Sequence, residues 1–206
     1  MNVTTTSVEA NPYSPPQARV ADVDQPAEGL LYVVAPRKFL ILMIGTAGLY
    51  TFYWFYKNWS LLNRKDQAYW PVPRAIFAIF FTHALFGEVD GLLQRQGRSK
   101  DYSWSPGGLA TTYVISAISG SVLGRLSVYG FGSPLLIVSL QQVVFVLTIC
   151  VIYRAQRAIN YAEDDAQGLR NKELTLANFG WLALGAVFWL LKFAGLFFIL
   201  SGRALR

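Results

Sequence analysis

The chain has 206 residues, of which 53 % are hydrophobic and 15 % aromatic, and its mean hydropathy is +0.34. This composition is too apolar for an ordinary soluble domain and indicates an integral membrane protein. The net charge of +6 resides in short basic segments between apolar runs, which favours anionic lipid headgroups as partners and argues against nucleic-acid binding.

Residues 1–35 are predicted to form a disordered, Pro-rich tail. Met1–Gly29 intersperses prolines with Thr, Ser, Asn and acidic residues, a composition that is typical of disorder. This tail does not resemble a secretory signal, because no Lys or Arg precedes Arg19 and the first apolar run begins only near Phe39. We expect the remainder, residues 36–206, to form one helical transmembrane domain.

The first apolar run, Phe39–Trp59, ends in the aromatic stretch YTFYWFYKNW. Aromatic side chains at the end of such a run are typical of the membrane interface, where Lys57 can extend its ammonium group toward water. Gly45 and Gly48, near the middle, permit a tight helix contact or a bend. We favour a spanning helix here, with a re-entrant hairpin as the alternative.

The second run, which begins at the sequence PVPRAIF, is ambiguous. Its apolar side chains contribute about −4 to −5 kcal/mol to membrane insertion, whereas a single acidic residue at the centre costs about +2.5 to +3.5 kcal/mol. On a helix, His83, Gly87, Asp90 and Gln94 share one polar face. Residues 74–94 are therefore expected either to cross the membrane or to lie in its plane.

The third and fourth runs, Leu109–Tyr129 and Leu135–Tyr153, are joined by the uncharged turn GFGSP and predict a pair of spanning helices. Ser116, Gly120 and Gly124 recur at every fourth residue of the third run and form a face of small side chains. We expect this face to pack against another helix of the same chain, with homodimerisation as the alternative.

The fifth run, Phe179–Leu200, is about as long as the hydrocarbon core requires of a helix. It contains Lys192, whose cost of insertion of about 3 kcal/mol is outweighed by the surrounding apolar side chains. We expect Lys192 to reach the interface or to pair with a carboxylate of the second run, with Glu88 and Asp90 as the natural partners.

Orientation follows from the basic residues in segments 94–108 and 154–178, because the turn between the third and fourth runs has no charge. The positive-inside rule places both segments in the cytoplasm and favours a cytoplasmic N-terminus. The basic residues between the first two runs contradict five full crossings, whereas a re-entrant first run with an in-plane second run accommodates every basic cluster. The side of the N-terminus therefore stays open, as does the choice between four and five helices.

The sequence GLYTFYWFYKNW at Gly48–Trp59, followed by PVPRAIFAIFFTHALF at Pro71–Phe86, resembles a family of small bacterial multi-pass membrane proteins defined only as a domain of unknown function. The resemblance extends loosely over residues 36–200. It implies a location in the bacterial inner membrane and no particular activity.

The candidate site consists of His83, Glu88, Asp90 and Lys192, because ionisable residues at membrane depth are typical of proton or ion paths. The alternative is that the residues of the second run mark the wet end of an interfacial helix. No nucleotide-binding, metalloprotease or redox motif occurs, and one His and one Cys cannot build a Cys/His zinc site. We expect no enzyme, no metal and no cofactor.

These observations predict an all-α polytopic membrane protein with four or five transmembrane or membrane-embedded helices behind a disordered tail. Its expected function is that of a non-enzymatic accessory or scaffold component of the bacterial inner membrane. Expected partners are anionic lipid headgroups at the basic loops, a second copy of the chain, or other membrane proteins. The alternative function is a small transporter or ion-conducting oligomer that uses the ionisable residues of the second run.

Overall fold

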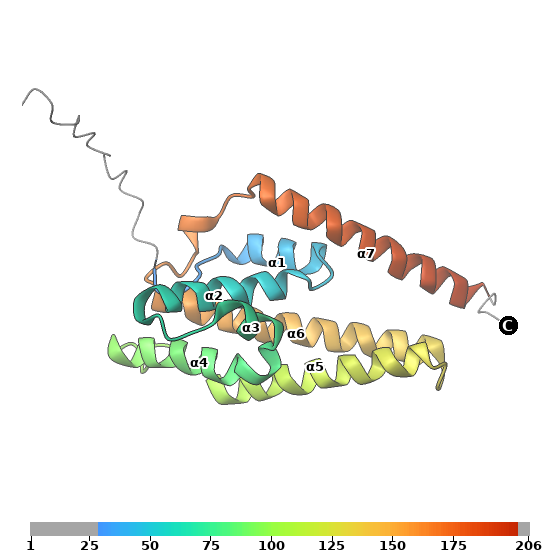
Figure 1. Cartoon of the computed structure of the whole chain (residues 1–206), viewed down its shortest axis with the longest axis horizontal. Coiled ribbons are helices and arrows are strands. Elements are labelled where there is room, and N and C mark those ends of the chain that lie inside the picture. Colours follow the sequence, from blue (N-terminus) through green and yellow to red (C-terminus); the bar gives the residue numbers. More distant parts are fainter. Residues whose placement is uncertain (1–28, 202–206) are drawn as a thin grey trace, which may run out of the picture.

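The structure, a computed structural model, describes residues 29–201 apart from the side chains of Lys65 and Asp66, and in this part of the chain all regular elements are helices. In chain order they are α1 (Pro36–Gly45), α2 (Tyr50–Asp66), α3 (Pro71–Ile76), α4 (Ala78–Arg95), α5 (Pro106–Val128), α6 (Pro134–Ala162), the 3-10 helix η1 (Leu169–Asn171) and α7 (Leu176–Leu200) (Figure 1). The predicted all-α fold is confirmed. Residues 1–28 of the predicted tail lie outside the described residues.

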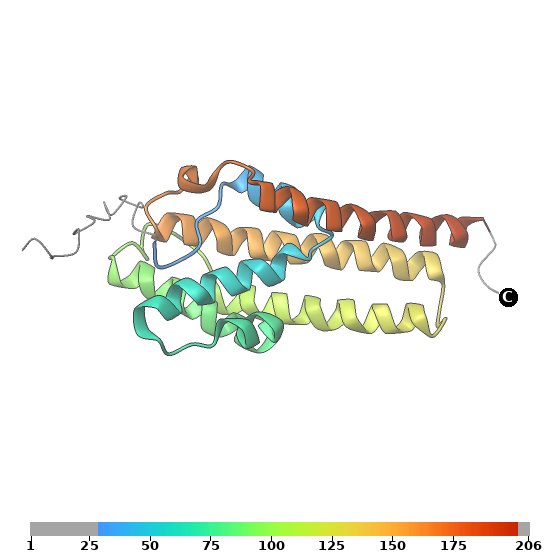
Figure 2. The same cartoon turned by 45° about the horizontal axis from the view of Figure 1, so that its top comes forward.

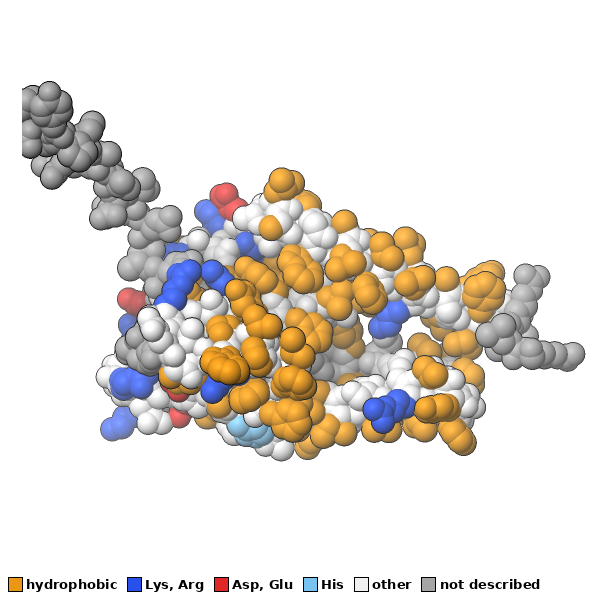
Figure 3. All heavy atoms as spheres, viewed as in Figure 1, with side chains coloured by type: hydrophobic (Ala, Val, Ile, Leu, Met, Phe, Trp, Pro, Cys, Tyr) orange, Lys and Arg blue, Asp and Glu red, His pale blue; other side chains and the backbone are white. Residues whose placement is uncertain are grey.

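The long helices α5, α6 and α7 run along the long axis, and the shorter helices α1–α4 gather beside one half of them (Figures 1 and 2). We call this half the basic end; it includes the C-terminal ends of α4 and α6 and the loop 163–175. Most of the visible Lys and Arg side chains gather there, whereas apolar side chains cover much of the rest (Figure 3). The opposite half, the far end, contains the turn 129–133 and Leu200.

Within the described residues, α5, α6 and α7 are the helices long and apolar enough to cross a membrane. They correspond to the third, fourth and fifth apolar runs. Pro106 and Pro134 open α5 and α6, where the missing N–H costs no helical hydrogen bond, and a capping box of Thr175 and Asn178 opens α7. These three helices support a membrane protein, but four or five spanning helices are not confirmed.

The first apolar run forms a helical hairpin rather than the single spanning helix that the sequence favoured. The chain turns between α1 and α2, where Ala47 and Gly48 have φ values of 52° and 89°. Such left-handed φ values interrupt a right-handed helix and suit glycine best. The Thr46 hydroxyl then accepts a hydrogen bond from the Tyr50 amide at 2.9 Å and helps to start α2. Both outer ends of this hairpin lie toward the basic end (Figure 1).

The second apolar run also forms two helices, because α3 and α4 meet at a break in the backbone at Phe77. Neither helix has the length and hydropathy of a spanning segment. The helix α4 packs against α5 and returns to the basic end (Figure 1). Its buried face includes Leu85, Phe86 and Val89, so it is held by the protein core as well as by any surrounding lipid.

The core lies at the basic end, among α1, α2, α4 and α6. Tyr50, Trp54, Phe55 and Trp59 are fully buried there, although the sequence predicted them as part of an interfacial belt. They are buried because the hairpin returns α2 to the packed half, where α2 lies against α3 and α4 and the Trp54 indole N–H donates to the Gln156 side-chain oxygen of α6 at 2.5 Å. This packing was not visible in the aromatic pattern itself. The extended segment 30–35 also belongs to this core, so the packed part of the chain begins before residue 36.

Candidate functional site

The two acidic residues of the predicted ion path each have their own partner. Glu88 accepts a hydrogen bond from the Tyr69 hydroxyl at 2.8 Å. Asp90 accepts one from the Trp104 indole N–H at 3.0 Å. The two donors lie in different loops, Tyr69 before α3 and Trp104 before α5, so each carboxylate of α4 is held by a separate neighbour.

The other two members of the predicted path lie on different helices. His83 is exposed on α4, with its Nε2 atom 3.1 Å from the Thr111 hydroxyl. Lys192 on α7 donates a hydrogen bond to the Gln142 side-chain oxygen at 3.2 Å, rather than to Glu88 or Asp90. Within residues 29–201 it forms no ion pair. The path built from all four residues stays a prediction.

The predicted face of small residues on α5 is used only in part. A Cβ atom added at Gly120 would lie 3.7 Å from Val144 Cγ1 on α6, an ordinary packing distance. A Cβ atom added at Gly124 would meet nothing within 4 Å. Ser116 is 2 % exposed and lies beside a cavity. The contact at Gly120 agrees with packing inside the chain.

A group of buried amide side chains holds the extended segment 30–35 in place. Asn160 on α6 accepts from the Val34 N–H at 3.2 Å and donates to the Val34 carbonyl at 2.8 Å. Asn58 accepts from the Tyr32 N–H at 3.0 Å, and Gln156 donates to the Tyr32 carbonyl at 3.0 Å. These amides replace a neighbouring β-strand, so the buried backbone groups keep their hydrogen bonds.

Asn171 in η1 continues this arrangement and connects it to Lys38. Its amide nitrogen donates to the Val33 carbonyl at 2.9 Å, and its oxygen accepts from the Lys38 ammonium at 2.6 Å. Lys38 also donates to the Glu173 carbonyl at 2.6 Å. Only 3 % of Lys38 is exposed, and no carboxylate in the described part of the chain forms an ion pair with it. Burial lowers the pKa of the Lys38 ammonium below its usual value of 10.5.

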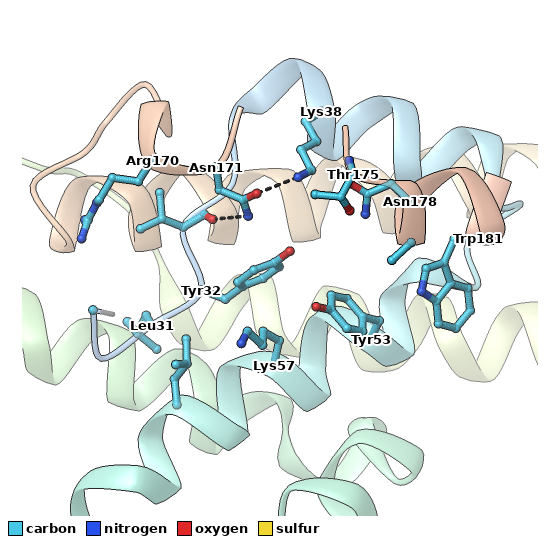
Figure 4. Close-up of a pocket in the computed structure, with 14 residues that line it drawn as sticks. Leu31, Tyr32, Lys38, Tyr53, Lys57, Arg170, Asn171, Thr175, Asn178 and Trp181 are labelled. Atoms are coloured by element: carbon cyan, nitrogen blue, oxygen red, sulfur yellow. Dashed lines mark hydrogen bonds between the residues drawn. The ribbon is translucent and has the colours of Figure 1, made fainter. Parts of the chain in front are cut away.

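A cavity of about 440 Å³, which we call the Lys38 cavity, lies beside this ammonium. Figure 4 shows Lys38 and Asn171 on one side and Tyr32 and Tyr53 on the other, with Trp181 of α7 at its edge. The remaining lining residues are Gly29, Leu31, Val33, Lys57, Leu61, Arg170, Thr175, Ala177 and Asn178. The cavity therefore combines cationic, aromatic and amide groups near the start of α7.

The acidic residues near this cavity accept hydrogen bonds from other residues of the chain. Burial raises the pKa of the Glu163 carboxyl, although the Leu31 N–H donates to it at 2.8 Å. Burial acts in the same direction on Asp165, but hydrogen bonds from the Arg170 and Leu169 amides and from the Arg170 guanidinium outweigh it, so the net pKa of Asp165 is lowered. Both carboxylates shape the loop 163–171 and neither neutralises Lys38.

This arrangement is suited to bind an anion that also carries apolar groups. A buried ammonium that is bound only to neutral oxygens has no counter-charge. Amphipathic aromatic side chains such as Tyr and Trp are typical of membrane interfaces. Sequence reasoning missed Lys38, Asn58, Gln156, Asn160 and Asn171. Gln156 and Asn160 were the sequence signal that could have revealed this group, because they are two amides four residues apart and so lie on the same face of a largely apolar helix.

Comparisons with known proteins add no family to this description. No protein-family model, no curated protein and no solved structure matches the chain. The resemblance to a family of small bacterial membrane proteins therefore stays a prediction, and the function must be argued from the cavity and the helices.

Proposed function

We propose that the protein is a non-enzymatic accessory component of the bacterial inner membrane that holds the headgroup of an anionic lipid in the Lys38 cavity. In this proposal α5, α6 and α7 cross the membrane, and the N-terminus and the basic end face the cytoplasm. The hairpin α1–α2 and the helix α4 enter the membrane only from the cytoplasmic side.

The observation that carries this proposal is the buried, positively charged Lys38 beside a cavity of about 440 Å³. A charge removed from water is costly unless an opposite charge approaches it, and an anionic headgroup would supply that charge. The cavity also lies where α7 begins, which is the level at which a spanning helix meets the interface. Trp181 and Tyr53 suit the same level.

An ion-conducting function has less support. Glu88 and Asp90 each accept a hydrogen bond from an aromatic side chain, and Lys192 lies on a different helix with Gln142 as its partner. A conducting path needs ionisable groups that line one water-filled route, whereas these contacts tie each group to a separate neighbour.

The test adds a negative charge to the cavity without removing any existing contact. Ala177 lines the cavity in the first turn of α7, where a glutamate is favourable for the helix. We expect phosphatidylglycerol to raise the thermal midpoint of the purified wild-type chain and of Ala177→Gln, but not that of Ala177→Glu. Lipid at about 100 times its dissociation constant adds about 2.7 kcal/mol, which corresponds to roughly 5–10 °C for a chain of this size.

The glutamine variant is the matched control, because it has the size of glutamate without its charge. Phosphatidylcholine, which carries no net charge, controls for general effects of lipid. Equal stabilisation of both Ala177 variants by phosphatidylglycerol would contradict the proposal. Equal stabilisation of the wild type by the two lipids would contradict it as well.

A further inference from the structure

A second cavity, which is separate from the Lys38 cavity, lies among the long helices and the turn between α1 and α2. Its volume is about 440 Å³, within the roughly 300–1,000 Å³ range of small-molecule pockets. We call it the Ser116 cavity. It is lined by Met43, Ala47, Gly48, Leu49, Thr51, Phe52, Ala75, Ala78, Tyr113, Ser116, Ala117, Gly120, Gln141, Val144, Phe145, Thr148, Ile149 and Lys192. On the far half, the molecule is hollowed between α7 and the α5–α6 pair (Figure 3).

Ser116 has a buried hydroxyl that no other group in the described part of the chain satisfies. Other helical hydroxyls, such as those of Thr112, Ser121 and Thr148, donate to the carbonyl four residues earlier. The Ser116 hydroxyl makes no such hydrogen bond, although only 2 % of the residue is exposed. A buried hydroxyl without a partner that lines a cavity is a donor available to a ligand.

Lys192 supplies a second donor to the same cavity. Its ammonium is bonded to Gln142 and lies 5.5 Å from the centre of the Phe145 ring and 5.2 Å from that of Trp189. No carboxylate lines this cavity. A ligand that satisfies both Ser116 and Lys192 must therefore contribute acceptor oxygens.

The two donors lie at different depths. Gly120 on α5 faces Val144 on α6, which fixes the relative height of the antiparallel helices. Ser116 lies four residues toward the basic end from this level. Gln142, which accepts the hydrogen bond from Lys192 and so marks the level of its ammonium, lies two residues toward the far end. At a rise of 1.5 Å per residue, Ser116 and Gln142 are about 9 Å apart along the helices.

Depth also restricts the class of ligand. Ser116 lies close to the middle of α5, about 18 Å from the end of the helix at Val128. Phospholipid headgroups stay at the interface, so their oxygens do not reach this level. A neutral, membrane-soluble molecule does. A flat ring with oxygens at opposite corners presents one acceptor toward each donor level, and each acceptor can be hydrogen-bonded at about 2.8 Å.

We propose that the Ser116 cavity binds a membrane-soluble para-quinone, with one carbonyl oxygen accepting from the Ser116 hydroxyl and the other from the Lys192 ammonium. Phe145 and Tyr113 supply the aromatic surface beside its ring, and the tail leaves through the hollow between α7 and the α5–α6 pair. This site shares no lining residue with the Lys38 cavity, so its test does not depend on lipid binding there.

The test measures binding of a radiolabelled, decyl-substituted para-benzoquinone to the full chain in lipid nanodiscs, after subtraction of binding to empty nanodiscs. We expect saturable binding to one site. Ser116→Ala should raise the dissociation constant roughly three- to tenfold, and Lys192→Met should raise it about tenfold or more. Decylbenzene, which has the same tail but no oxygens, should not compete.

Ser121→Ala is the matched control, because Ser121 lies on the same helix but its hydroxyl is bonded to the Ala117 carbonyl. Ser116→Ala removes a buried hydroxyl without a described partner, so its thermal midpoint should be no lower than that of the wild type, and a folding defect cannot explain weaker binding. The proposal is overturned by the absence of saturable binding, by wild-type affinity in both variants, or by equal competition from decylbenzene.

Discussion

Asn160 shows how one side chain can replace a β-strand neighbour. Its amide group bonds both the N–H and the carbonyl of Val34, at 3.2 and 2.8 Å, in the fully buried core. It also accepts from the Gln156 amide at 2.6 Å, which fixes the orientation of both amides. An extended segment packed among helices would otherwise leave its backbone groups without partners, which is costly inside a protein.

Asn160→Ala should therefore lower the free energy of unfolding by about 2–6 kcal/mol, because two buried backbone groups lose their partners at about 1–3 kcal/mol each. The measurement is thermal unfolding of the purified chain in detergent. Ser139→Ala is the control, since Ser139 is exposed on the same helix and bonds only the Leu135 carbonyl. Equal midpoints for the two variants would show that the amide does not hold the segment.

At the scale of elements, α7 is attached to the rest of the molecule at a small number of places. Within α7, Asn178 and Gly185 are the buried residues. A Cβ atom at Gly185 would overlap the Gly45 carbonyl oxygen and the Thr46 Cα atom at the end of α1. Close to this crossing, the Trp189 indole donates to the Ile44 carbonyl at 2.7 Å. The absence of a side chain at Gly185 thus permits the contact between the two helices.

Gly185→Ala should destabilise the chain by about 1–3 kcal/mol, the usual cost of forcing an extra group into a packed contact. Gly195→Ala, on the same helix, should be neutral or stabilising by about 0.5–1 kcal/mol, because a Cβ atom there meets nothing within 4 Å and alanine favours the helix. Thermal midpoints of the two variants, compared in one detergent, give the answer. The same change in both would exclude the tight crossing.

The elements differ in how far the sequence could predict them. Hydropathy was sufficient to predict α5, α6 and α7 as helices long and apolar enough to cross a membrane, because length and apolar composition are local properties of the sequence. It was insufficient for the first run, because the break depends on left-handed φ values at Ala47 and Gly48. Glycine permits such a value without requiring it, and an alanine gives no sign of it. The burial of segment 30–35 depends on Asn58 and Asn160, which are distant in the chain, so local patterns could not reveal it.

For the whole molecule, prediction of the site is limited in the same way, because the site depends on contacts between residues that are distant in the chain. The candidate path was read from the types of residue in the second run and Lys192, and contacts such as Tyr69 with Glu88 decide whether such groups are available. The Lys38 cavity joins α1, α2, the loop 163–175 and α7. A cavity that four separate segments build has no signature in any one of them. The expectation of anionic lipid came only from the basic residues of the loops, and it stays a prediction.

The proposed topology with three crossings makes a prediction about the whole molecule that cysteine labelling can check. Single cysteines at Ser60, Ser99 and Ser133, in a Cys150→Ala background, are exposed to a membrane-impermeant maleimide in intact cells. We expect labelling at position 133, in the turn at the far end, and labelling at positions 60 and 99 only after lysis. The reason is that the hairpin α1–α2 and the helix α4 return to the basic end, so both sites stay on the cytoplasmic side (Figure 1). If residues 74–94 crossed the membrane, positions 60 and 99 would lie on opposite sides, and one of them would be labelled in intact cells. That result would remove the cytoplasmic orientation on which the Lys38 cavity depends for contact with the inner leaflet.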